Sequence, residues 1–253
     1  MRRMPWQTEI RLEKANELKN LCSMTKAAED LVIEGLWDIW LDFDNKKILI
    51  PNELSEEIVE NFRKKYEGIE IARLEGSFIT GIPFKESYHY FIHKFSQIGR
   101  RAIKTIVDRT AVTGREHALF ITDDGYGVAI EGEEERVLFP PSSLCIAIHT
   151  HPASNRVENP AFCFPSPSDM RNAIGFFLDG GLLFGIASSG FILYLQRTWI
   201  ITEGQLDKIS ELPNKIEIIL KKASKKPTDI FGELQNFLKG LPFELIIEKL
   251  ELS

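Results

Sequence analysis

Between residues 95 and 202 the apolar positions switch from helical to strand spacing and back. Helical spacing of Ile98, Ala102 and Ile106, with basic residues on the opposite side, predicts a helix that leads to residue 116. Apolar runs between glycine turns then predict strands at 117–121, 127–131, 136–139 and 144–148, a helix at 169–178, and a hairpin of 182–187 and 191–195. The alternation of helices and strands predicts an α/β fold.

Two further regions flank this central one, and they predict a chain of three parts. Residues 1–92 suggest an N-terminal α/β module: a helix in 1–35, a hairpin of 37–43 and 47–50, a helix from Ser55 to Tyr66 and a strand at 69–74. Residues 205–253 suggest a mostly helical C-terminal extension, with helices at 205–224 and at 229–238, the second capped by Thr228. The apolar stretch 243–252 fits a strand or a short helix. An exposed tail of that kind would aggregate, so we expect it to dock on the protein or on a second subunit.

The candidate chemistry lies where the strand at 144–148 ends. The strand leads into His149-Thr150-His151-Pro152, and alternation along an extended segment places the two imidazoles on one side. Pro152 ends the strand because it has no N–H to donate. Asp169 follows Ser166 at the start of the next helix and can supply a third ligand. Two imidazoles and a carboxylate leave one zinc position open for water, which is typical of a catalytic zinc site.

A hydrolase of this kind also needs a general base, and Glu116 stands between the predicted helix and the strand at 117–121. With Glu116, the His-x-His motif and the Ser-x-x-Asp motif in place, the sequence resembles the JAMM (MPN-plus) metalloproteases. The Arg115-Glu116-His117 flank resembles the RadC-type branch of that superfamily.

The resemblance covers about residues 96–202, where the order of helices and strands is that of the JAMM fold, and it implies a JAMM-type, cytidine-deaminase-like mixed β-sheet flanked by helices. It implies that His149, His151 and Asp169 bind Zn²⁺, that Glu116 is the base, and that the Ser166 hydroxyl stabilises the oxyanion. It further implies hydrolysis of peptide or isopeptide bonds, with a protein or peptide substrate such as a ubiquitin-like conjugate on lysine. The chain departs from the family in one respect: residues 152–165, 14 in place of the usual seven, separate His151 from Ser166. This loop is either a wall of the substrate cleft or a passive surface loop. Its aromatic and polar residues are Asn155, Arg156, Asn159, Phe162, Cys163 and Phe164.

Two other functions stay open on the sequence. The first is a RadC-like protein of uncertain activity linked to DNA metabolism, and the second is a non-catalytic MPN-type scaffold. Retention of the five motif residues together argues against a scaffold. His89 and His93 stand four residues apart on a helical pattern, but no carboxylate or cysteine at ligand spacing supports a second metal site there.

Composition adds limits on partners and compartment. The net charge of −6 gives no reason to expect nucleic acid as the main partner. No apolar stretch approaches the roughly 20 residues of a membrane span, and the N-terminus lacks the apolar core of a signal peptide. Three cysteines cannot all pair within one chain, and Cys145 is expected to be a small core residue, so we expect a reducing, cytoplasmic setting.

Overall fold

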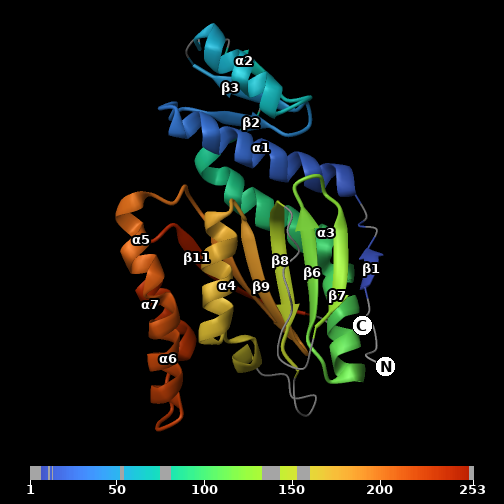
Figure 1. Ribbon diagram of the computed structural model, residues 1–253, viewed down its shortest axis with the longest axis vertical. Coiled ribbons are helices and arrows are strands. Elements are labelled where there is room, and N and C mark those ends of the chain that lie inside the picture. Colours follow the sequence, from blue (N-terminus) through green and yellow to red (C-terminus); the bar gives the residue numbers. More distant parts are fainter. Residues whose placement is uncertain are drawn as a thin grey trace.

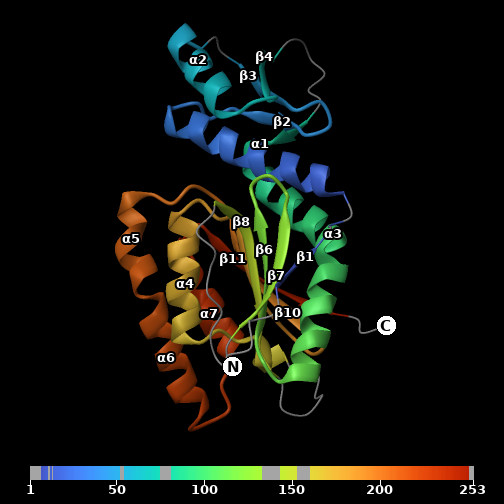
Figure 2. The same cartoon turned by 45° about the vertical axis from the view of Figure 1, so that its right-hand side comes forward.

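The computed structural model describes residues 7–10, 12, 14–51, 54–74, 81–132, 143–152 and 160–250. It is a mixed α/β structure built on two sheets (Figures 1 and 2). The predicted strand at 136–139 and the loop residues Asn155, Arg156 and Asn159 lie outside the described residues.

The large sheet has seven strands in the order β1-β7-β6-β8-β9-β10-β11. Only β8 and β9 are parallel neighbours; the other pairs are antiparallel. The strands are β1 (Gln7–Ile10), β6 (His117–Thr122), β7 (Gly127–Glu131), β8 (Leu144–Thr150), β9 (Leu183–Ser188), β10 (Phe191–Arg197) and β11 (Phe243–Lys249). Strand β8 is central and buried along its whole length, as its continuous apolar run predicts.

Helices cover both faces of the large sheet. Helices α1 (Ala15–Ile33) and α3 (Phe84–Thr113) pack on one face, where their apolar residues join those of the sheet in one core. Helix α4 (Pro167–Leu178) packs on the other face with α6 (Leu212–Ala223) and α7 (Ile230–Leu238), and α5 (Glu203–Ser210) precedes α6. The predicted mixed sheet between helices is thus confirmed (Figure 2).

The N-terminal module forms the second sheet, of four strands in the order β4-β3-β2-β5. Its strands are β2 (Trp40–Asp42), β3 (Lys47–Ile50), β4 (Glu70–Arg73) and β5 (Ile82–Pro83), and α2 (Glu56–Lys65) connects β3 to β4. The predicted hairpin forms between β2 and β3, and the Ser55 side chain caps α2 by accepting from the Ile58 N–H. Helix α1 runs between the two sheets in Figure 1.

Several predicted boundaries are wrong. Residues 7–10 form a strand and not part of a helix, because they pair with β7 at the edge of the large sheet. Helix α3 begins at Phe84, so the expected boundary between residues 92 and 96 falls inside it. In the tail, Asp229 and not Thr228 caps α7, since its carboxylate accepts from the Gly232 N–H at 2.9 Å. The undecided stretch 243–252 contains β11, which pairs with β10 along seven residues.

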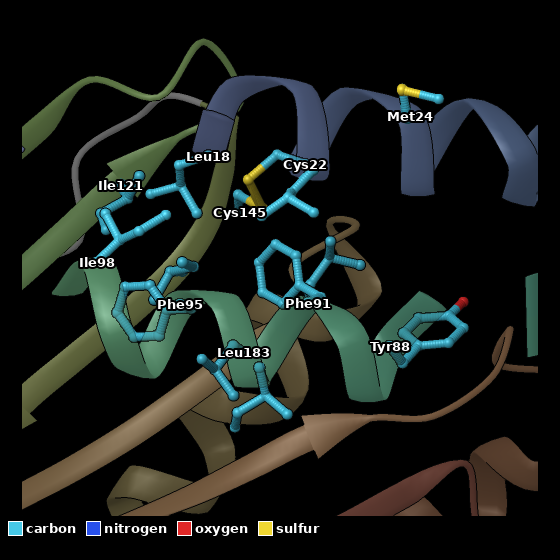
Figure 3. Close-up of a cluster of buried hydrophobic side chains, with 14 of the residues drawn as sticks. Leu18, Cys22, Met24, Tyr88, Phe91, Phe95, Ile98, Ile121, Cys145 and Leu183 are labelled. Carbon is cyan, nitrogen blue, oxygen red and sulfur yellow. A yellow bond between two sulfur atoms is a disulfide. The ribbon is translucent and has the colours of Figure 1, made fainter. Parts of the chain in front are cut away.

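The cysteines also differ from expectation. Cys145 is fully buried, as predicted, but its sulfur is bonded to that of Cys22 on α1. Figure 3 shows this disulfide among the apolar side chains between α1, α3 and the sheet, beside Leu18 and Phe91. Cys163 is the remaining, free cysteine. The odd cysteine count therefore does not support a reducing compartment.

One buried carboxylate links helix α1 to helix α3 and to the large sheet. Glu29 on α1 accepts from the Tyr88 hydroxyl on α3 at 2.6 Å and pairs with Arg197 at the end of β10. Glu29 and Arg197 are 8% and 5% exposed. A charge buried this deeply requires its partner, so the pair fixes how α1 sits on the large sheet.

Candidate metal centre

The two histidines stand at the end of the central strand. His149 lies within β8, opposite Ala118 of β6 on one side and beside Ile186 of β9 on the other. His151 lies just past the strand, where its N–H donates to the Ala187 carbonyl at 2.9 Å. Because His149 and His151 are two residues apart on an extended backbone, both imidazoles point to the same face of the sheet, the one that α4 covers.

Asp169 reaches the same point from the first turn of α4. Ser166 caps this helix: its hydroxyl accepts from the Asp169 N–H at 3.1 Å, and its own N–H donates to the Asp169 carboxylate at 2.7 Å. Pro167 occupies the first helical turn, where no N–H is needed. This reciprocal capping box fixes the direction of the Asp169 side chain.

The three side chains converge on one point. His149 Nε2 lies 3.1 Å from Asp169 Oδ1, His151 Nε2 lies 3.3 Å from Asp169 Oδ2, and the two Nε2 atoms lie 3.2 Å apart. Ligands at 2.0–2.1 Å from a tetrahedral zinc are separated from one another by roughly 3.3–3.4 Å. The spacing of the donor atoms therefore suits a single small cation, and within the described part of the chain these residues are the only such group of three.

Protons alone do not satisfy this arrangement. With Asp169 ionised, each contact to the carboxylate needs a proton on the histidine nitrogen, but the contact between the two nitrogens needs a proton on only one of them. No placement of protons makes all three contacts hydrogen bonds at once. A cation accepts all three lone pairs, so the chemistry of the donor set fits a metal ion.

The pKa directions in the site follow from these contacts. Burial would raise the pKa of the Asp169 carboxyl, but hydrogen bonds and charge from His149 and His151 hold it well below its usual range. Burial would lower the pKa of His151, yet the hydrogen bond and negative charge of Asp169, together with the charge of Glu116, raise it above its ordinary value. The carboxylate is thus in the ionised form that metal binding requires.

Glu116 lies beside His151, directly before β6. In the antiparallel pair of β6 and β8, Ala118 lies opposite His149. Two residues further along, the same register sets Glu116 opposite His151, with its side chain on the face of the sheet that carries the two imidazoles. The Gly132 N–H donates to the Glu116 carbonyl at 2.8 Å, and the side chain is half-buried. The structure thus brings Glu116, His149, His151, Ser166 and Asp169 together.

Sequence reasoning missed a set of polar residues on the other face of the sheet, the face that α3 covers. The Thr150 hydroxyl, on the opposite face from the two imidazoles, accepts from the His117 N–H at 2.8 Å and contacts the Thr110 hydroxyl on α3. His117 Nδ1 lies 3.1 Å from both Thr110 Oγ1 and the Arg115 carbonyl. These contacts tie β6 to β8 next to Glu116. The sequence held one signal for these contacts. Side chains alternate along a strand, so Thr150, between His149 and His151, had to point to the opposite face, toward α3.

The described part of the loop between the motifs lies against His151. Residues Pro160–Cys163 form a 3-10 helix, η1, and His151 Nδ1 lies 3.0 Å from the Phe162 carbonyl. The loop therefore contacts a candidate ligand directly. His89 and His93 both lie on α3, where His89 Nδ1 is 3.4 Å from Glu244, but among the described residues no second group of three ligands forms.

No protein-family model, curated protein or solved structure matches the chain. In the described residues no helix is long and apolar enough to cross a membrane.

Proposed function

We propose that the chain is a zinc-dependent metallopeptidase of the JAMM type, which hydrolyses peptide or isopeptide bonds. The convergence of His149, His151 and Asp169 at mutual distances of 3.1–3.3 Å carries this proposal. The placement of Glu116 on the same face supports it, since a hydrolase needs a base next to the metal-bound water. The seven-stranded mixed sheet between helices is consistent with a JAMM-type fold.

Each site residue has a distinct task in this proposal. Zinc, when bound, would lower the pKa of its water to about 7 and polarise the substrate carbonyl. Glu116 would take the proton of the attacking water and deliver it to the leaving amine, so that hydroxide ends on the carbonyl carbon and hydrogen on the nitrogen. Ser166 uses an oxygen lone pair for the Asp169 N–H, which leaves its own proton to donate to the developing oxyanion.

The test uses the full chain loaded with one equivalent of zinc. The substrates are a peptide library and a lysine-linked conjugate of a ubiquitin-like modifier, and cleavage is read by mass spectrometry. Glu116→Gln is the matched control, because it retains the shape of the side chain but removes the base. We expect the variant to retain zinc and to lose cleavage by about 10²–10⁴-fold. Equal cleavage by the wild type and the variant would move the base elsewhere, and a zinc-loaded wild type that cleaves nothing would favour a scaffold.

A further inference from the structure

The two histidines of the centre are held in different ways. His149 lies inside β8, with a strand on each side and the Phe184 ring 5.5 Å from its own. His151 lies beyond the last residue of β8 and is followed by Pro152, which has no N–H for a ladder. Sheet pairing alone thus fixes His149 more firmly than His151.

The η1 turn supplies a second hold on His151. The Phe162 carbonyl can only accept, so the His151 Nδ1 atom 3.0 Å away carries a proton. Nε2, on the other side of the ring, is then the nitrogen that faces His149 and Asp169 and that would bind a metal. A hydrogen bond of this kind fixes both the tautomer and the plane of a metal-binding imidazole.

Cys163 anchors the turn. Its sulfur is fully buried, 3.0 Å from the Ser188 hydroxyl at the end of β9 and 3.1 Å from the Phe191 carbonyl at the start of β10. A thiol can donate to a carbonyl, and burial raises the pKa of Cys163, which keeps the thiol protonated. The residue that follows Phe162 is therefore fastened to the β9–β10 hairpin.

The C-terminal extension braces the same turn. Phe164, which is 6% exposed, packs edge-on against Phe231 of α7 with ring centroids 5.5 Å apart. Helix α7 itself packs on α6 and β11. A path of direct contacts thus leads from α7 through Phe164 and η1 to His151.

We propose that η1 positions His151 for metal binding, and that Cys163 and Phe231 are positioning residues that set the metal affinity of the centre. This inference rests on the metal site of the proposed function and assigns a role to the extra residues between the two motifs. The extension then contributes to the centre without supplying a ligand.

The experiment measures zinc affinity by competition with a chelator, using the full chain and the variants Phe231→Ala, Cys163→Ala and Cys163→Ser. Loss of a hydrogen-bonding partner behind a ligand typically lowers metal affinity 10–100-fold, and we expect this for Phe231→Ala and Cys163→Ala. Cys163→Ser retains a donor toward Phe191 and should recover most of the loss. The control is Phe237→Ala on the same helix, which removes an aromatic ring from the same apolar cluster, one that lies under the ammonium groups of Lys208 and Lys215; it should leave the affinity within about twofold of the wild type.

A second measurement separates positioning from general destabilisation. Nitrogen-15 NMR of the metal-free protein reports the protonation and hydrogen bonding of each histidine nitrogen, and we expect His151 Nδ1 to be protonated and hydrogen-bonded in the wild type and to lose that hydrogen bond in part in Phe231→Ala. Wild-type zinc affinity and wild-type hydrogen bonding of His151 Nδ1 in Phe231→Ala and Cys163→Ala would overturn the inference, even if the wild type cleaves its substrate. A protein that binds zinc but cleaves nothing would refute the proposed function and leave this inference standing. A wild type that binds no zinc would overturn both this inference and the proposed function, because η1 would then position no metal ligand.

Discussion

Reduction of the disulfide between Cys22 and Cys145 should lower the free energy of unfolding by several kcal/mol. The two residues are separated by 123 positions in sequence, so the bond closes a long loop in the unfolded chain. The loop-closure entropy for such a length corresponds to about 5 kcal/mol at room temperature. This is a large fraction of the roughly 5–15 kcal/mol by which a folded domain is usually stable.

The assay is urea unfolding followed by tryptophan fluorescence, with and without a phosphine reductant. With a slope of about 3 kcal/mol per molar urea, the reduced wild type should unfold at a midpoint lower by roughly 1.5–2 M. Cys22→Ala lacks the bond under both conditions, so its midpoint should not respond to the reductant. Thiol titration of the denatured, unreduced protein should find the Cys163 thiol alone. Three titratable thiols in the purified protein, or a wild-type midpoint indifferent to reductant, would refute the reasoning.

Three further predictions follow from the packing and from the site. Deletion of residues 228–253 removes β11 and leaves β10 as an edge strand, so we expect insoluble protein or a clearly lower melting temperature by calorimetry; a soluble truncation with unchanged melting would contradict the docked tail. Ser166→Ala should cost about 1 kcal/mol of stability in urea unfolding, because α4 loses its cap, whereas Ser166→Asn retains a capping side chain. If the hydroxyl also stabilises the oxyanion, Ser166→Ala should lose about 10²-fold in kcat, and a fully active Ser166→Ala would remove that role. Arg197→Met leaves the Glu29 carboxylate buried without its cation and should cost about 3–5 kcal/mol, part of which Glu29→Gln in the same chain should restore; a single variant as stable as the wild type would show that the ion pair does not hold α1 in place.

The central region could be predicted from the sequence because its signals are local. The apolar run before His149 and the Ser166–Asp169 capping box each depend on neighbouring residues, so their spacing predicted a buried strand and a helix start. The same spacing predicted that three ligands meet at the strand end, and the structure brings them within reach of one another. Zinc itself, the reaction and the cytoplasmic setting stay predictions.

The features that sequence reasoning missed depend on contacts between distant residues. Residues 7–10 are a strand because β7 pairs with them, and this pairing overrides local preference. The bond from Cys22 to Cys145 needs α1 to cross the buried end of β8, which no spacing in the sequence reveals. The contact of Phe162 with His151 is made by a backbone carbonyl, so the identity of the side chain gave no signal for it.

Metal analysis of the purified full chain tests the central claim most directly. After incubation with equimolar zinc and removal of excess metal, we expect about one zinc per chain by mass spectrometry, as three ligands around one point predict. Asp169→Asn is the matched variant, because it preserves size and capping geometry but removes the negative charge, and it should retain far less zinc. A wild type without zinc, or an Asp169→Asn chain that retains as much zinc as the wild type, would contradict the account.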